Sequence, residues 1–132
     1  MRRSETAPLS LLPALQTQLW FASCELAFQT ALVERSRLVY LKAGDYLFTQ
    51  GDEQESLCCV VAGALKLGST DQHDGSLRLT LYVEPYTWFG EVSTIDMLPR
   101  SQDAVADVDS TVMVVSGPAL LEWLEAHPRH WR

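Results

Sequence analysis

The chain has 132 residues, of which 47% are hydrophobic and 20% are charged, and its formal net charge is −7. This length and balance predict one soluble domain with a core that needs no disulfide or metal support. The acidic charge argues against a domain that itself binds nucleic acid, because phosphate contacts need clustered Lys and Arg. If the protein acts on DNA, its DNA-binding part lies outside these residues.

Cysteine usage and hydropathy indicate a cytoplasmic protein. The three cysteines, Cys24, Cys58 and Cys59, are odd in number and form no CxxC pair, so no disulfide framework is predicted. The longest apolar run, residues 57–65, is too short to cross a bilayer. Glu5 and the prolines and glutamines after it interrupt what would be the apolar part of an N-terminal signal.

Residues 1–36 are predicted to form a helical lead-in. Leucines at helical spacing indicate a first helix over residues 9–18. A second helix is predicted to begin with Ser23 as its N-cap and Glu25 in its first turn, where the helix dipole favours a carboxylate. Trp20 and Phe21 are predicted to pack in the core between these helices and a sheet.

Residues 37–116 read as short strands separated by Gly, Asp, Ser and Pro. The predicted strands cover residues 37–41, 46–48, 57–67, 77–83, 102–108 and 111–116. Many short strands without alternating helices predict a mainly β fold, an antiparallel jelly roll. Asp74-Gly75 marks a hairpin turn, because both residues tolerate positive φ. Leu79, Leu81 and Val83 point to one side of their strand, which predicts that this face is packed.

A closing helix is predicted within residues 117–132. Gly117-Pro118 starts it, and it ends near Pro128. The chain is therefore interpreted as a single domain without internal repeats.

The strongest functional signal is the segment WFGEVSTIDMLPRSQDA, which begins at Trp88. Gly90 has no Cβ and lets a ligand approach the backbone. The residues after it would open a short helix whose N–H groups attract an anion. Arg100 offers a planar fork of donors suited to a phosphate, and Ser101 adds a hydroxyl. Glu91 is suited to accept hydrogen bonds from a ribose hydroxyl.

This segment resembles the phosphate-binding cassette of cyclic nucleotide-binding domains, in which Gly-Glu is followed about nine residues later by Arg-Ser. It is most similar to the sensor domains of bacterial transcription regulators of the Crp/Fnr type. Further matches fall at residues 42–45, 50–52, 61–67 and 109–112, and the resemblance covers residues 18–128. It implies a double-stranded β-roll without enzymatic activity. It also implies an attached helix-turn-helix domain, outside this chain, and a homodimeric parent protein.

The resemblance also implies the ligand and its contacts. The effector would be cyclic AMP or another cyclic nucleotide, and no cofactor or metal is required. The predicted ligand-binding residues are Gly90, Glu91, Val92, Ser93, Arg100 and Ser101. Residues that could line the pocket or set its specificity are Thr80, Leu81, Phe89, Gln102 and Asp103.

Three departures from the family pattern bear on the ligand. Tyr86 stands where relatives usually have glycine, and Gln102-Asp103 stand where they usually have small residues. The long helix that covers the base in relatives is missing from the chain. On a strand, Ser101 and Asp103 would point the same way about 7 Å apart, so the Asp103 carboxylate would repel a bound phosphate.

Two other functional classes stay open. The first is an interaction domain that keeps the β-roll and has lost its ligand. The second is a metal-binding jelly-roll enzyme, which the sequence disfavours because it contains no HxH pair. Haem ligation through Cys58, Cys59 or His73 has no support from their spacing.

Overall fold

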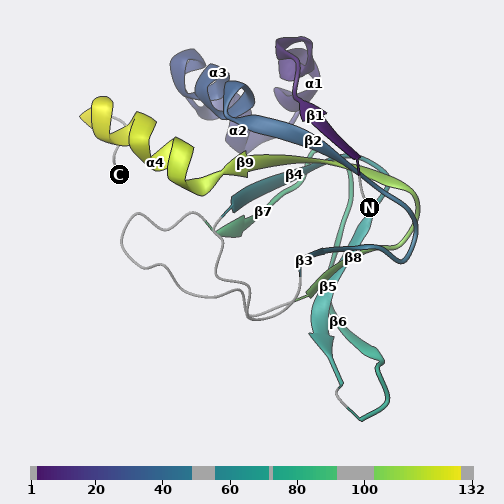
Figure 1. Cartoon of the computed structure of the whole chain (residues 1–132). Helices are drawn as coiled ribbons and strands as arrows, with labels where there is room; N and C mark the ends of the chain where they lie inside the picture. Colours follow the sequence, from purple (N-terminus) through teal and green to yellow (C-terminus); the bar gives the residue numbers. More distant parts are fainter. Residues whose placement is uncertain (1–2, 49–55, 72, 92–102, 129–132) are drawn as a thin grey trace.

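Two antiparallel sheets form the body of the protein in the computed structural model, which describes residues 3–48, 56–71, 73–91 and 103–128 (Figure 1). The larger sheet has the strand order β1-β2-β9-β4-β7 and the smaller one β3-β8-β5-β6. The strands of the larger sheet are β1 (Arg3–Thr6), β2 (Ser36–Leu41), β9 (Ser110–Ser116), β4 (Ser56–Ala62) and β7 (Trp88–Glu91). Those of the smaller sheet are β3 (Tyr46–Phe48), β8 (Asp103–Ala106), β5 (Leu65–Thr70) and β6 (Leu77–Val83). The predicted antiparallel β-roll is confirmed.

The larger sheet is buried on both faces. Val39, Val60 and Val112 point into the space between the sheets, where they meet Leu65 of the smaller sheet. The alternate residues of the same strands, such as Cys59 and Met113, pack against the helices. Because side chains alternate along a strand, burial on both faces requires a continuous apolar run, as in β4.

The helices cover the outer face of the larger sheet (Figure 1). They are the 3-10 turn η1 (Leu9–Leu11), α1 (Leu12–Leu15), α2 (Leu19–Ser23), α3 (Leu26–Glu34) and α4 (Gly117–Ala126). Leu32 of α3 and Leu124 of α4 join the outer core, and the rings of Phe28 and Trp123 lie 5.9 Å apart. None of the helices in the described part of the chain combines the length and apolarity needed to span a membrane.

The lead-in differs from the prediction in three places. Residues Arg3–Thr6 form a strand, β1, that pairs with β2. Ser23 is the last residue of α2 instead of a cap, and the N-cap of α3 is Glu25. Phe21 is fully buried as predicted, whereas Trp20 is 44% exposed because α2 presents that side to solvent.

The predicted strand over residues 57–67 is divided into β4 and β5. Gly63 has a φ of +83°, which breaks the extended backbone and sends β5 into the other sheet. The same residue permits a close approach, since a Cβ there would lie 2.3 Å from the Ser110 hydroxyl oxygen. The corner between the sheets therefore depends on glycine at this position.

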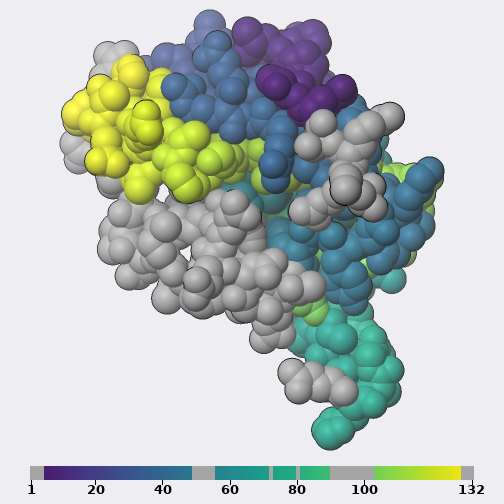
Figure 2. All heavy atoms as spheres, viewed as in Figure 1, coloured from purple at the N-terminus to yellow at the C-terminus, as the bar shows by residue number. Residues whose placement is uncertain are grey.

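The β5–β6 hairpin is confirmed, and it projects from the rest of the molecule (Figures 1 and 2). The predicted packing of one β6 face is correct only at its base. Val83 is fully buried, but Leu79 and Leu81 are 53% and 49% exposed. The physical reason is the position of β6 at the edge of the smaller sheet, beyond the larger sheet.

Candidate functional site

The predicted Gly-Glu pair lies at the end of β7, an edge strand of the larger sheet. Gly90 is paired with Leu57 and Glu91 with Ser56, both on β4. The backbone that leads into the predicted cassette is thus fixed by a central strand of the roll. Five predicted residues lie outside the described residues, so their roles stay predictions: Val92, Ser93, Arg100, Ser101 and Gln102.

Phe89 lies beneath the start of the cassette as part of the inner core. It is 7% exposed and packs in the cluster that contains Leu67 and Val83. Its ring lies 6.3 Å from that of Phe48 on β3. Phe89 therefore connects β7 to the smaller sheet and supports the Gly-Glu step from below.

Leu81 and Thr80 come from the other sheet. Leu81 on β6 is paired with Leu67 on β5, so the two side chains share the inner face of the roll. Leu67 is buried, but Leu81 is half exposed and offers an apolar surface that a ligand can cover. Thr80 lies beside the bulge in this pairing, at Leu67 and Gly68.

The carboxylate of Asp103 is occupied by a partner that the sequence did not suggest. Asp103 opens β8 opposite Gly68, is 4% exposed and accepts a hydrogen bond from the Thr70 hydroxyl. Thr70 lies 33 residues earlier in the chain, so no local pattern could have identified it. The predicted effect of Asp103 on a phosphate held by Ser101 stays a prediction, because Ser101 lies outside the described residues.

Aromatic rings fix the outer face of β7 to the lead-in. Trp88 stacks on Phe21 with ring centroids 5.4 Å apart and planes at 10°, and Trp20 meets Trp88 edge-on at 5.5 Å. Among the side chains that the structure describes, the buried Trp88 indole N–H is without a hydrogen-bond partner. A shallow cavity of about 310 Å³ beside these rings is also lined by Gln18 and Leu57. Helix α2 thereby holds β7 in place.

A polar network ties the smaller sheet together on its exposed side. The Tyr82 hydroxyl donates to Asp107 at 2.6 Å, and the Lys66 ammonium lies 3.5 Å from the same carboxylate. The hydrogen bond from Tyr82 lowers the pKa of Asp107 and raises the pKa of Tyr82. These contacts join β5, β6 and the end of β8, which makes the network structural.

The cysteines do not form a reactive or metal-binding group. No disulfide joins them, and Cys58 and Cys59 are fully buried. Burial, followed by the neighbouring Cys58, raises the pKa of Cys59 to about 12, so its thiol stays protonated at neutral pH. Within the described ranges, no three His, Cys, Asp or Glu side chains gather as metal ligands.

The sequence matches the family model of the cyclic nucleotide-binding domain over residues 38–127. The chain belongs to this family. It is 26% identical over 108 residues to the CRP-like cAMP-activated global transcriptional regulator of Mycobacterium tuberculosis. That alignment covers 82% of this chain and 48% of the relative, so the chain spans about half the length of the curated relatives it matches.

Solved structures agree with this assignment. The N-terminal domain of a transcriptional regulator from Streptomyces coelicolor A3(2) superimposes with a TM-score of 0.72 at 29% identity, covering 87% of this chain and 80% of that one. The sensor domain of the transcriptional regulator DNR from Pseudomonas aeruginosa shares the fold, with a TM-score of 0.74 at 22% identity and coverage of 91% and 81%.

Together the comparisons confirm the resemblance to Crp/Fnr sensor domains and the β-roll fold. The related proteins are transcription regulators, so the prediction that the chain is not an enzyme is also confirmed.

Proposed function

We propose that this chain is the effector-sensing domain of a Crp/Fnr-type regulator and that it binds a cyclic nucleotide, with cyclic AMP as the first candidate. The observation that carries the proposal is the Gly90-Glu91 step. It is held by β4 at the end of β7, inside the region that matches the cyclic nucleotide-binding family. The name of the Mycobacterium tuberculosis relative, a cAMP-activated regulator, supports the choice of ligand.

In this proposal the chain supplies three kinds of contact. Glu91 accepts hydrogen bonds from a ribose hydroxyl, and Arg100 with Ser101 donates to the cyclic phosphate. The backbone N–H groups of Val92 and Ser93 add donors at the start of a short helix. Leu81, half exposed on the inner face, provides apolar surface for the base.

The signal would pass to an attached helix-turn-helix domain outside this chain, in a cytoplasmic homodimeric protein. Relatives about twice as long support this arrangement. The chain's own net charge of −7 assigns DNA contact to another part of the protein.

A ligand-free interaction domain is the second candidate. It is favoured by Gln102 and Asp103, which replace the small residues that follow Arg-Ser in relatives, and by the burial of Asp103 against Thr70. A polar pair and a carboxylate next to the phosphate would weaken binding of a charged ligand.

Calorimetric titration and native mass spectrometry together separate the two candidates. The purified chain is titrated with cyclic AMP, cyclic GMP and linear 5′-AMP at equal ionic strength. Native mass spectrometry of the untreated protein searches for a nucleotide carried through purification. The proposal expects saturable binding of one cyclic nucleotide at a ratio of one per chain, with 5′-AMP weaker. No heat with any of the three and no co-purified nucleotide would favour the interaction domain.

A further inference from the structure

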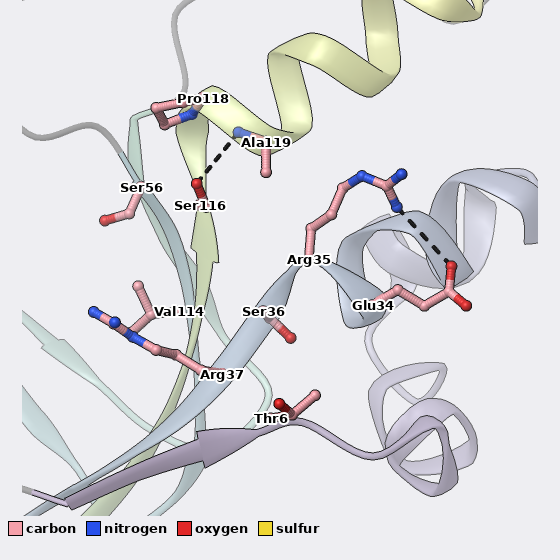
Figure 3. Close-up of a pocket in the computed structure, with 10 residues that line it drawn as sticks. All are labelled: Thr6, Glu34, Arg35, Ser36, Arg37, Ser56, Val114, Ser116, Pro118 and Ala119. Atoms are coloured by element: carbon pink, nitrogen blue, oxygen red, sulfur yellow. Dashed lines mark hydrogen bonds and ion pairs between the residues drawn. The ribbon is translucent and has the colours of Figure 1, made fainter.

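A second polar cavity lies where the first turn of α4 meets the strands β2 and β9 (Figure 3). Its volume is about 490 Å³, within the size range of small-molecule sites. Of the described residues predicted for the nucleotide site, none lines it. The two places are nevertheless neighbours, because Ser56 on β4 is the register partner of both Glu91 and Ser116.

Two arginines give this cavity a positive charge in a strongly acidic protein. Arg35 and Arg37 flank Ser116, with Arg35 beside the first turn of α4 and Arg37 beside Val114 (Figure 3). The single carboxylate among the described lining residues is Glu34, which is 54% exposed and lies 3.9 Å from Arg35. A contact that long and that exposed leaves most donors of the Arg35 guanidinium available.

Arg37 carries the stronger argument. Within the described ranges no carboxylate lies within ion-pair distance of its guanidinium, although the chain carries 17 acidic residues. A guanidinium at the wall of a cavity presents five N–H donors in a planar fork that matches the oxygens of a phosphate or carboxylate.

The rest of the lining complements an anion without competing for it. The Ser116 oxygen accepts the Ala119 N–H at 3.2 Å, which leaves the hydroxyl proton of Ser116 to donate. The Thr6 hydroxyl, at the end of β1, faces the same cavity. Helix α4 contributes the positive end of its dipole rather than N–H donors, since Pro118 has none and Ala119 is capped.

We propose that this cavity is a second binding site for a small oxyanion of the phosphate or carboxylate type, held by Arg37 and Arg35 with Ser116 and Thr6 as hydroxyl donors. The site is separate from the proposed nucleotide site and does not depend on it. Its anion would join β1, β2, β9 and the start of α4, which come from both ends of the chain.

The test is an NMR titration of the ¹⁵N-labelled chain with inorganic phosphate, and in a second arm with succinate, at fixed pH and ionic strength. The proposal expects saturable shifts of the Arg35 and Arg37 Nε–H signals and of the Ser116 and Ala119 backbone N–H. Saturation by one anion and not by the other identifies the preferred chemistry. Shifts that grow linearly without saturating for both anions would overturn the proposal.

Variants provide the controls. Arg37→Ala should weaken the anion about tenfold or more, and Arg37→Lys should restore part of the affinity, because a point charge replaces the fork. Arg78→Ala, at an exposed position on β6 away from the cavity, should change nothing. An equal loss with Arg78→Ala would show general charge attraction and overturn the site. The cyclic AMP affinity of Arg37→Ala should equal that of the parent chain. A tenfold loss there would assign Arg37 to the nucleotide site instead.

Discussion

At the scale of single residues, Gly63 and Gly44 have the same backbone hand but different surroundings. Their φ values are +83° and +91°. A Cβ at Gly63 would lie 2.5 Å from the Asp109 carbonyl oxygen and 2.8 Å from the Ser110 Cα, whereas a Cβ at Gly44 meets nothing within 4 Å. The pair therefore separates the cost of a left-handed backbone from the cost of a steric clash.

We predict that Gly63→Ala lowers the free energy of unfolding by about 3 kcal/mol or more, from backbone strain plus overpacking. Gly44→Ala should cost only about 1 to 2 kcal/mol, because strain acts alone. Urea denaturation followed by circular dichroism measures both. Equal losses in the two variants would show that the corner between β4 and β5 relaxes around the added methyl group.

Residue-level patterns predicted which types of side chain matter better than where they point. Gly90 and Glu91 were placed by a local motif, and a local motif is enough because one strand pairing fixes them. The environment of Asp103 could not be predicted, because its partner Thr70 lies on β5, the neighbouring strand in space but 33 residues away in sequence. Trp20 was placed in the core because hydrophobicity alone does not show which side of α2 faces solvent.

At the scale of elements, the Phe21–Trp88 stack holds α2 against the strand that leads into the proposed nucleotide site. Phe21 is fully buried, and its neighbour Trp20 is 44% exposed although it touches the same Trp88 ring. A stacked, buried ring contributes its burial and its contact with the partner, whereas an exposed ring contributes little of either.

We predict that Phe21→Ala lowers the unfolding free energy by about 3 to 5 kcal/mol, in line with buried aromatic truncations. Trp20→Ala should cost about 1 kcal/mol, mainly from the aromatic contact. Thermal and urea unfolding monitored by far-ultraviolet circular dichroism gives both values, independently of the change in tryptophan content. A larger loss for Trp20→Ala than for Phe21→Ala would contradict the burial seen here.

Elements with a strong apolar period were predictable, and the weakly patterned ones were not. The β5–β6 hairpin and α4 follow from turn residues and leucine spacing and are confirmed. Strand β1 has the sequence RSET, with no apolar residue, so only its pairing with β2 makes it a strand. The boundary between β4 and β5 was missed because an apolar run does not show which glycine turns the chain into the second sheet.

At the scale of the whole molecule, the fold is a scaffold with two places suited to anions in an acidic chain. The proposed nucleotide site begins at the end of β7, and the arginine-lined cavity lies beside the start of α4. The strand β4 connects them, since Ser56 pairs with both Glu91 and Ser116. Sequence predicted the first place through its resemblance to a family. It gave no sign of the second, because residues 35, 37 and 116 meet only in the folded chain.

The central claim is that a cyclic nucleotide binds at the segment introduced by Gly90-Glu91, with Arg100 on its phosphate. The most direct measurement is isothermal titration of the parent chain and of Arg100→Ala with cyclic AMP, together with the melting temperature of each. We predict that the parent chain binds saturably, and that Arg100→Ala loses about tenfold or more in affinity because a charge-assisted contact is removed. Its melting temperature without ligand should stay close to that of the parent. A lower melting temperature with unchanged affinity would contradict the claim and make Arg100 a structural residue.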